Sequence, residues 1–417
     1  MSKKRIWIMN HYATNMFFNQ GGRHYWFAKY LLEHGYEPTI FCANTRHNRE
    51  EAVALHGQKY IRKISGKIPF VFVKSGGYRG NRFDRIKNML QFAWNLYALA
   101  KKLGTSYGRP DLILASSVHP LTLVAGLAIA KKFGVGCIGE IRDLWPEALV
   151  TYGFLKGDSL AARALYRGEK WLYKKMDKLI FTQEGGKDYI IEKGWDRDQG
   201  GPLDLNRVGH INNGIDLEAF DYNRSRYVLE DEDLEEPGSF KVIYTGSLGL
   251  VNKVEKVLDV AKILKDQGVK FLIWGTGDQL DHLRNRVKVE QLKNVSFKGW
   301  VEKKYVPSIT TRGQLNIILG DNLPLYRFGT SNNKLFDYFA SGKPILITKS
   351  YGYSLIERYR AGRELADNSA ENIARNILYF KNLDEDEYSR YGQNARQAAR
   401  DYDFKKLTKK LVDFIEA

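Results

Sequence analysis

Residues 241–275, KVIYTGSLGLVNKVEKVLDVAKILKDQGVKFLIWG, carry the pattern that decides the fold. A short apolar run at 241–246 ends in glycine, a helical pattern starts near Asn252 and Lys253, and a second apolar run fills 270–275. A strand, a crossover helix and a strand in this order are typical of a parallel sheet.

The same alternation extends in both directions along the chain. Further strands are predicted at residues 5–10, 38–43, 111–116, 136–141, 178–183, 294–299, 315–320 and 344–349. Helical patterns fall between the earlier ones, at about 22–34, 121–133 and 160–175, and the chain after Tyr351 is mostly helical. The pattern predicts an α/β protein with two doubly wound domains in tandem.

A chain of 417 residues is too long for one ordinary core, so two domains are expected. We predict a first domain at 1–206, to which a C-terminal helix at about 398–417 returns, and a second at 207–397. The polar stretch 194–239 joins them, with the hinge near 207–214 and the acidic run LEDEDLEEPG (229–238) as a surface loop.

Composition points to a folded intracellular protein. Hydrophobic residues make up 43% of the chain, and its two cysteines, Cys42 and Cys137, form neither a disulfide framework nor a metal-ligand pattern, so a reducing cytosol is expected. The start of the chain is too polar for a signal peptide. Residues 112–130 lack charges, but Pro120 in their middle favours strand, loop and helix over a membrane span.

The net charge of +17 favours a polyanionic partner, such as an anionic membrane, a nucleic acid or a phosphorylated substrate. Part of it lies at 79–102, where apolar residues recur at helical spacing among cations. This segment is either a membrane-docking helix or a core-packed amphipathic one, and periodicity does not separate the two. A second basic stretch at 163–178 tilts the interpretation toward a membrane surface.

Glycine-rich loops follow several predicted strands, where parallel sheets bind ligands. Gly21 and Gly22 precede a helix, and their free N–H groups could bind phosphate or sugar. In TGSLG (245–249) the small residues are Gly246, Ser247 and Gly249, and Lys253 would supply a counter-charge to a diphosphate. A plain strand-to-helix turn explains either loop equally well.

Residues 325–347, LYRFGTSNNKLFDYFASGKPILI, form the most informative segment. Thr330 or Ser331 could cap a helix whose N–H groups, with Lys334 and Arg327, would receive phosphate oxygens. Asp337 lies one to two turns further on and is placed to accept hydrogen bonds from ribose hydroxyls. The alternative is a simple cap followed by a solvated aspartate.

These motifs together resemble glycosyltransferase family 4, which has the GT-B fold, and within it the bacterial capsule and O-antigen branch that includes L-fucosamine transferases. The similar features occur in the family's order over about the whole chain. They are the opening GG, SSVHP (116–120), GEIRDLWPE (139–147), NNGID (212–216), TGSLG and GTSNNKLFDYFASGKPIL (329–346).

The resemblance implies two Rossmann-like domains facing across a cleft, and retaining transfer of a hexose or N-acetylaminosugar from a nucleotide-diphosphate sugar, with UDP expected over GDP. No metal or cofactor is implied, because cations and helix N-termini take the charge. The implied acceptor is a polyprenyl-diphosphate-linked saccharide in surface polysaccharide synthesis. The protein would then be cytoplasmic and peripheral to the inner face of the membrane.

The resemblance also assigns residues. His119, Arg142 and Asp143 would act on the acceptor side, and Lys253 and Lys334 on the leaving diphosphate. The family's pair of glutamates is replaced by Gly329 and Asp337, and an arginine common in the TGSLG loop is missing. The donor sugar must then be held by backbone N–H groups or by side chains of the segment Arg327, Thr330, Ser331, Asn332 and Asn333.

Two other functions stay open. A nucleotide-sugar 2-epimerase would share the architecture without an acceptor. A nucleic-acid-binding protein would explain the positive charge, but no nucleic-acid-binding module is recognised, so no nucleic-acid partner is expected.

Overall fold

The computed structural model describes residues 3–46, 52–77, 82–117 and 119–417, without the side chain of Arg82. The chain divides into two compact units. Unit 1 comprises Met1–Asn212 together with Phe404–Ala417, and unit 2 comprises Asn213–Asp403. The break at Asn212 falls within the hinge region that the sequence indicates.

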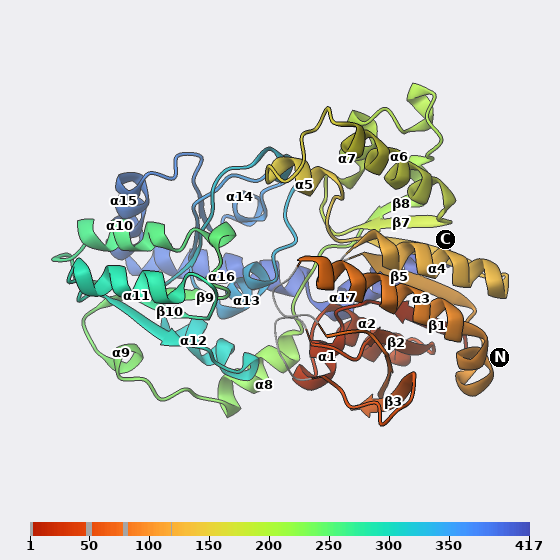
Figure 1. The fold of residues 1–417 in the computed structure, drawn as a ribbon. Coiled ribbons are helices and arrows are strands. Elements are labelled where there is room, and N and C mark those ends of the chain that lie inside the picture. The colour runs from red at the N-terminus through yellow and green to blue at the C-terminus, as the bar shows by residue number, and fades with distance from the viewer. Residues whose placement is uncertain (1–2, 47–51, 78–81, 118) are drawn as a thin grey trace. The chain divides into compact units, whose positions relative to one another are not determined.

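Unit 1 is built on an eight-stranded sheet of order β3-β4-β2-β1-β5-β6-β7-β8 (Figure 1). All neighbours are parallel except the hairpin of β3 and β4 at one edge. The strands are β1 (Arg5–Met9), β2 (Glu37–Ala43), β3 (Tyr60–Ser65), β4 (Ile68–Val73), β5 (Leu112–Ser117), β6 (Gly136–Ile141), β7 (Lys178–Phe181) and β8 (Val208–His210). Five of these strands match predicted ones, and β3, β4 and β8 were not predicted.

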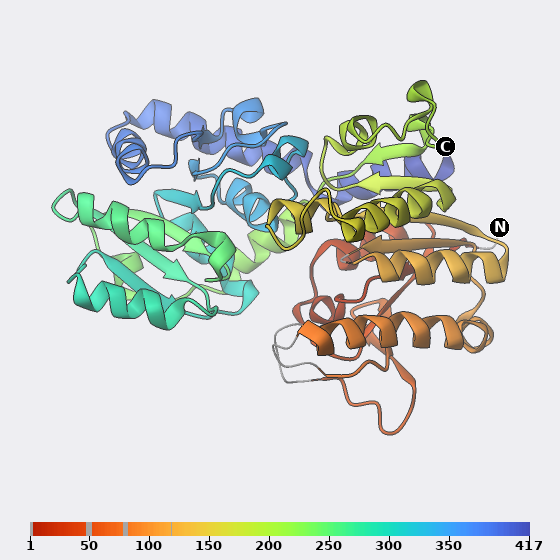
Figure 2. The same ribbon diagram turned by 45° about the horizontal axis from the view of Figure 1, so that its top comes forward.

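Three helices of unit 1 lie side by side on one face of this sheet. They are α3 (Arg82–Tyr107), α4 (Pro120–Phe133) and α6 (Leu160–Lys175), and α4 packs between the other two, as Figure 2 shows. The remaining helices are α1 (Thr14–Asn19), α2 (Arg23–Glu33), α5 (Glu147–Thr151) and α7 (Gly186–Glu192), with 3-10 turns η1 (Arg197–Gln199) and η2 (Leu205–Arg207). Residues 112–130 are thus a strand followed by a helix. None of the helices in the described ranges combines the length and the apolarity that a membrane crossing needs.

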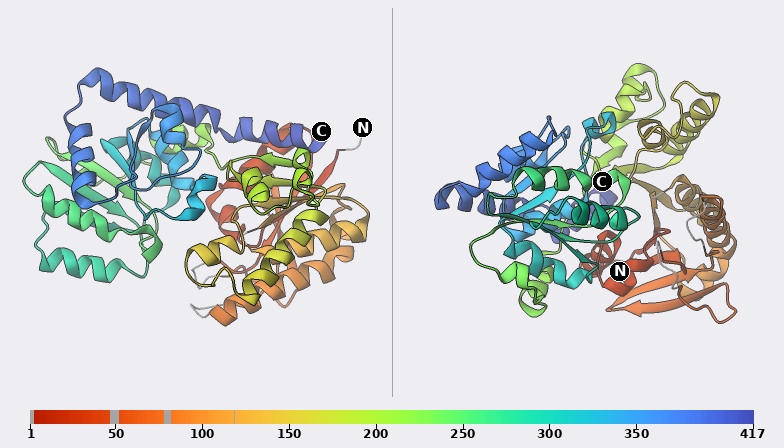
Figure 3. Two further views of the ribbon diagram at one scale, coloured as in Figure 1. Left: turned by 90° about the horizontal axis from the view of Figure 1, so that it is seen from above. Right: turned by 60° about the vertical axis from the view of Figure 1, so that its left-hand side comes forward.

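The C-terminal helix α17 (Phe404–Glu416) belongs to unit 1, as predicted for the end of the chain. It packs along α2, where the rings of Phe27 and Phe404 meet edge to face at 5.6 Å. Lys178 donates a hydrogen bond of 2.7 Å to the carbonyl oxygen of Phe414, and Lys4 pairs with Glu416 at 2.8 Å. In Figure 3 the blue end of the chain lies beside the red N-terminal segments of this unit.

Unit 2 contains a six-stranded, wholly parallel sheet of order β11-β10-β9-β12-β13-β14. Its strands are β9 (Phe240–Thr245), β10 (Val269–Trp274), β11 (Val295–Gly299), β12 (Leu315–Ile318), β13 (Ile345–Ile347) and β14 (Gly362–Glu364). Its helices are α8 (Leu217–Arg226), α9 (Glu232–Glu235), α10 (Glu255–Ile263), α11 (Leu280–Val289), α12 (Val306–Arg312), α13 (Asn333–Ser341), α14 (Leu355–Tyr359), α15 (Ala370–Lys381) and α16 (Glu385–Asp401), with turns η3 (Leu250–Asn252), η4 (Lys303–Tyr305) and η5 (Pro324–Phe328). The helix expected from Asn252 begins at Glu255, after a 3-10 turn.

The acidic run 229–238 lies mostly on the surface, as predicted, but it is not a plain loop. Part of the run forms α9, and Leu234 is buried against the side chains of Trp274 and Ile309. Lys298 pairs with Asp231 at 2.9 Å and with Asp233 at 2.6 Å. These ion pairs and the buried leucine attach the segment to unit 2.

Candidate functional site

Two glycine loops interlock at the carboxyl ends of β9 and β10 in unit 2. Gly246 N–H donates to the carbonyl of Trp274 at 2.9 Å, and Leu248 N–H donates to the carbonyl of Thr276 at 2.9 Å. A Cβ at Gly275 would lie 1.7 Å from the carbonyl oxygen of Gly246, so only glycine permits this approach. The GTG turn at 275–277 therefore supports the predicted TGSLG loop, a role that its sequence did not reveal.

The helix α13 begins beside these loops. Its N-cap is Asn332, whose side chain accepts a hydrogen bond of 3.2 Å from Lys334 N–H. The prediction that Thr330 or Ser331 is the cap is wrong, because the Thr330 hydroxyl instead accepts from Asn332 N–H. Asp337, one turn further along, is buried and forms an ion pair with Lys303. The carboxylate is therefore not the freely solvated helix residue of the alternative interpretation.

The ammonium group of Lys334 reaches back to the TGSLG loop. Its Nζ donates to the hydroxyl of Tyr244 at 3.0 Å and lies 4.3 Å from the centre of that ring. A Cβ at Gly246 would lie 2.7 Å from this Nζ. The stem of Lys334 is partly exposed while its charged end is enclosed, and this burial, with repulsion from Lys349, lowers the pKa of Lys334 to about 7.

Lys349 is a buried lysine that the sequence analysis did not single out. It follows β13 and lies beside the loop after β12, where its Nζ is 3.4 Å from the hydroxyl of Tyr326. Burial lowers the pKa of Lys349 to about 8. The only sequence signal for it was its place after a predicted strand, in ITKS (347–350).

The predicted diphosphate lysine Lys253 has carboxylate partners. Its Nζ lies 3.4 Å from Asp321 and 3.9 Å from Glu255, and Lys256 pairs with the same Asp321 at 2.8 Å. Ser247 and Gly249 are on the surface of this loop. A ligand at this loop would share Lys253 with these carboxylates.

The other predicted donor residues lie in η5 and the turn before α13. Arg327 is exposed and donates a hydrogen bond of 2.6 Å to the carbonyl oxygen of Pro324. Gly329 has a φ of 93°, which requires glycine, and the carbonyl oxygen of Ser331 accepts from Asn213 Nδ2 at 2.6 Å. Asn333 is exposed in the first turn of the helix.

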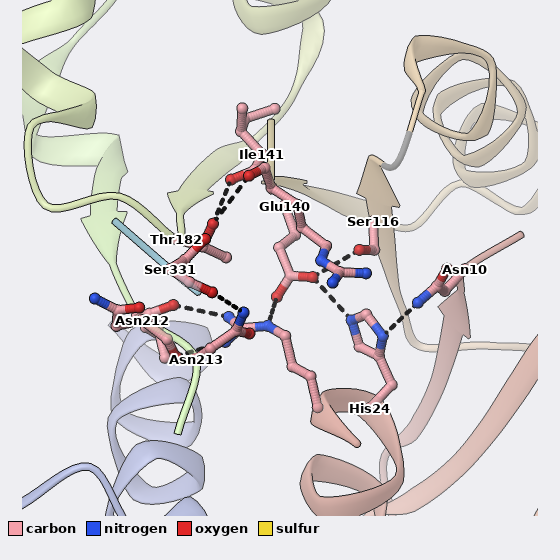
Figure 4. A network of polar contacts seen from close by, with 12 residues as sticks. Asn10, His24, Ser116, Glu140, Ile141, Thr182, Asn212, Asn213 and Ser331 are labelled. Carbon is pink, nitrogen blue, oxygen red and sulfur yellow. Dashed lines mark hydrogen bonds and ion pairs between the residues drawn. The ribbon is translucent and has the colours of Figure 1, made fainter. Parts of the chain in front are cut away.

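In unit 1 a buried polar network gathers at the carboxyl ends of β1, β5 and β6 (Figure 4). Glu140 receives hydrogen bonds from Arg23 Nε at 2.7 Å, His24 Nε2 at 2.8 Å and the Ser116 hydroxyl at 2.7 Å. Burial alone would raise the pKa of Glu140, but the charge of Arg23 and the hydrogen bond from His24 hold it well below its usual value. Glu140 is therefore an ionised carboxylate whose charge Arg23 neutralises.

The tautomer of His24 follows from its partners. The Asn10 side-chain oxygen accepts from Tyr12 N–H, which turns the Asn10 amide nitrogen toward His24 Nδ1 at 2.8 Å. His24 thus accepts at Nδ1 and donates from Nε2 to Glu140, which is the neutral ring. Burial lowers the pKa of His24 in agreement with this.

The same network holds the chain where unit 1 ends. Arg23 NH2 donates to the carbonyl oxygen of Ile211 at 2.8 Å, and NH1 donates to that of Asn212. Gly22, at a φ of 102°, is the N-cap residue of α2, and Gly21 precedes it. The GG motif thus places Arg23 and His24 at the start of a helix.

His119 lies in a second buried cluster. Its Nε2 is 2.6 Å from His11 Nδ1, and the His11 ring stacks on Tyr12 and Phe92 with centroids 4.4 and 4.5 Å away. Burial lowers the pKa of His119 to about 4, so the ring is neutral at pH 7. Within the described residues, Nδ1 of His119 has no hydrogen-bond partner. Val118, in the SSVHP motif, lies outside the described residues.

The IRD element follows β6. Arg142 N–H donates to the Ser117 hydroxyl at 3.2 Å, and its carbonyl oxygen accepts from Gln183 at 2.7 Å. Asp143 is exposed at the end of this turn. Among the residues that the structure describes, no group of three or more His, Cys, Asp or Glu side chains could hold a metal ion.

Two family models match the chain in succession. The model of "Glycosyltransferase Family 4" matches residues 25–219, and that of "Glycosyl transferases group 1" matches residues 229–398. Together the two matches span most of the chain, which is therefore similar to the family 4 glycosyltransferases. A probable glycosyltransferase, WbjE from Pseudomonas aeruginosa, is 23% identical over 316 residues, which are 73% of this chain and 75% of WbjE.

Solved structures share the GT-B fold of this chain. HepE from Anabaena in complex with UDP and glucose has a TM-score of 0.66 at 12% identity, with 99% of both chains covered. The E. coli trehalose-6-phosphate protein bound with UDP-2-fluoro glucose has a TM-score of 0.73 at 10% identity, again over 99% of both chains. A glycosyltransferase from Rickettsia africae has a TM-score of 0.65 at 14% identity, over 100% of this chain and 99% of the other.

Sequence reasoning missed the side chains that complete both sites. Glu140 lies inside the quoted motif GEIRDLWPE, in which roles were predicted only for Arg142 and Asp143. Arg23 and His24 follow directly after the GG that was noted. A charged residue inside an otherwise apolar strand was the available signal for Glu140, since such a residue is rarely buried without a partner.

Proposed function

We propose that this chain is a family 4 glycosyltransferase that transfers a hexose or N-acetylaminosugar, with retention, from a nucleotide-diphosphate sugar to a lipid-linked acceptor in surface polysaccharide synthesis. The proposed donor site lies at the loops after β9 and β10 and at the start of α13 in unit 2. The observation that best supports it is the position of Lys334. Its ammonium is enclosed between Tyr244 and Gly246 at the start of a helix, where an anionic leaving group would be stabilised without a metal.

The proposed roles of the neighbouring residues follow from their positions. The N–H groups at the start of α13 and that of Ser247 would donate hydrogen bonds to phosphate oxygens, whereas the Gly246 N–H is already bonded to the carbonyl of Trp274. Asp337 would accept hydrogen bonds from ribose hydroxyls after exchanging Lys303 for them. UDP is the proposed nucleotide, a choice supported by the UDP and UDP-sugar complexes of HepE and of the E. coli protein.

In the proposed reaction, the bond between the sugar's anomeric carbon and the phosphate oxygen breaks, and a bond from that carbon to the acceptor oxygen forms on the same face. The proton of the acceptor hydroxyl passes to the departing phosphate, so no enzyme nucleophile is needed. Lys334 stabilises the negative charge on that phosphate. The products are the glycosylated acceptor and the nucleoside diphosphate.

We propose the acceptor site at the loops of unit 1 that carry His119, Arg142 and Asp143. His119 is neutral, so it would bind a hydroxyl by hydrogen bonding from or to Nδ1, rather than by charge. The buried Glu140 network would position these loops, because Ser116 and Ser117 connect β5 to Glu140 and to Arg142.

A donor screen tests the proposal. Thermal shifts would be compared for UDP, GDP and ADP and for their sugars, because a ligand that binds only the folded state raises the melting temperature. We expect the largest shift with UDP compounds, and release of UDP from a UDP-sugar only when a lipid-linked acceptor is added. Conversion of the donor sugar without release of UDP would instead identify a 2-epimerase, and no shift with any nucleotide would contradict the proposal.

The second part of the proposal is that unit 1 docks on an anionic membrane. The apolar stripe of α3 is exposed and not packed in the core, with Phe83 81% and Trp94 69% exposed, and Ile86 and Leu90 between them also on the surface. The opposite side of α3 supplies the buried Phe92 and Leu96. This distribution favours the membrane-docking interpretation over the core-packed one.

Exposed cations accompany this stripe. On α3 they are Arg85, Lys87, Lys101 and Lys102, and on α6 they are Arg163, Arg167, Lys174 and Lys175, around the exposed Leu160 and Trp171. Lys178, counted with this group in the sequence, instead binds Phe414, and Arg79 lies outside the described residues. The helix α4 packs between α3 and α6 on one face of the sheet. The exposed apolar and basic residues of α3 and of α6 could therefore contact one lipid surface.

Co-sedimentation with vesicles tests this part. We expect binding to vesicles that contain phosphatidylglycerol and little binding to phosphatidylcholine alone. The double substitution Phe83→Ser and Trp94→Ser should weaken binding by about tenfold or more, since both side chains would insert at the interface. Val289→Ser, at a position 71% exposed in unit 2, is the control. Equal binding by all variants would remove the membrane from the proposal.

A further inference from the structure

We propose that Lys349 is a second phosphate-binding residue and that Lys334 and Lys349 together hold the diphosphate of the donor. This inference rests on the proposed function and adds a residue to its donor site. It identifies the source of the positive charge that the TGSLG loop lacks, since that loop has no arginine.

The first argument is that Lys349 is buried with no carboxylate in direct contact, although the more distant Asp321 and Glu364 partly offset its charge. The residue is 7% exposed, and within the described residues no carboxylate lies within ion-pair distance of its Nζ. Its polar contact is the Tyr326 hydroxyl at 3.4 Å, and the Tyr326 ring lies 4.6 Å away. Burying an ammonium that is only partly compensated is costly, so an anion that neutralises it when bound would explain its retention.

The second argument is that two such lysines lie together. The positive charge of Lys349 acts on Lys334, whose Nζ likewise lacks a carboxylate within ion-pair distance in the described chain. Gly246 and Gly320 leave room for the two ammonium groups, because a Cβ at either glycine would come within 3 Å of a lysine Nζ. Two like charges side by side are unfavourable until a group of opposite charge binds between or beside them.

The third argument is the contrast with the nearby lysines. Lys253 and Lys256 both pair with Asp321, the residue directly after Gly320. The carboxylate of Asp321 therefore partly neutralises their positive charge. Around these loops Lys253 and Lys256 therefore contact a carboxylate directly, whereas Lys334 and Lys349 have carboxylates only at longer range. A diphosphate would be expected at Lys334 and Lys349, with the N–H groups at the start of α13 completing its contacts.

Titration calorimetry with UDP and with UMP tests the inference on the full-length protein. Lys349→Met should weaken UDP binding by roughly ten- to hundredfold, because one charge-assisted contact is lost, and should affect UMP less. Lys256→Met, which removes a lysine paired with Asp321, should stay within about threefold of the wild type.

The melting temperature of Lys349→Met without ligand shows whether the substitution affects ligand binding or the stability of the fold. Removing a buried charge that is only partly compensated should leave Lys349→Met at least as stable as the wild type, whereas a structural role would lower its melting temperature. If the wild type binds UDP and Lys349→Met binds it equally well, the inference is overturned and the proposed function stands. If the wild type binds no nucleoside diphosphate, including GDP and ADP, the proposed function itself fails.

Discussion

At the level of single side chains, the loss of water around the two lysines is the dominant effect. A lysine in water has a pKa near 10.4, whereas burial lowers that of Lys334 to about 7 and that of Lys349 to about 8. Near neutral pH Lys334 and Lys349 are therefore only partly protonated. A phosphate group favours the protonated form, so ligand binding and proton uptake are coupled.

This coupling predicts the pH dependence of donor binding. Bound diphosphate raises the pKa of both lysines, so above pH 7 binding takes up protons and the affinity for UDP should fall as the pH rises. The fall should approach about tenfold per pH unit for each lysine that titrates, and it can be measured as the dissociation constant at pH 7, 8 and 9.

The Lys334→Met variant should bind more weakly at pH 7 and show a shallower slope, because only Lys349 would still titrate. A slope equal to that of the wild type would contradict the assignment of Lys334 to the phosphate.

At the level of secondary-structure elements, the proposed donor site depends on two loops that have almost no space between them. The turn after β10 passes so close to the loop after β9 that a methyl group at Gly275 would overlap the carbonyl of Gly246. The loop at Gly246 in turn limits where the ammonium of Lys334 can lie. The glycines therefore position the cation through backbone packing.

Gly275→Ala should destabilise the protein by roughly 3 kcal/mol, because backbone must move to admit the methyl group. Gly238→Ala is the matched control in the same unit. Its φ of 80° also disfavours alanine, but no atom lies within 4 Å of the added Cβ, so about 1 kcal/mol is expected. Urea unfolding of both variants measures the difference, and equal losses would show that steric overlap at Gly275 does not matter.

For the molecule as a whole, the chain returns to unit 1 after completing unit 2. Residues 404–417 pack on α2 through Phe404, Leu407 and Leu411, all buried. The first unit therefore lacks part of its core until the last helix of the chain is in place. Both ends of unit 2 are consequently connected to unit 1, at Asn212 and at Phe404.

A chain that ends at Asp403 should lose stability in unit 1 on the order of 5 kcal/mol, from the apolar side chains that are no longer buried. Hydrogen exchange should increase in α2 and β2 and stay unchanged in β9 and β10. Lys409→Ala, which removes an exposed pair with Asp413, should have no measurable effect on either unit. Increased exchange throughout unit 2 would show that the helix supports both units.

The alternation of apolar runs and helical patterns determined the two parallel sheets, because buried parallel strands need continuous apolar residues. It could not reveal β3, whose middle residues Arg62 and Lys63 face solvent at a sheet edge. Glycine motifs likewise indicated the loops of the proposed donor site, because a close approach of two backbone segments requires glycine.

Only the tertiary structure decided which charges are paired. Glu140 with Arg23 and His24, and Lys253 with Asp321, are brought together by strands and helices far apart in sequence. The exposure of Phe83 and Trp94 was likewise visible only in the tertiary structure. An apolar stripe at helical spacing has the same sequence pattern whether it packs against a core or contacts a membrane. Charge and burial depend on neighbours in space, and residue spacing along one chain does not specify them.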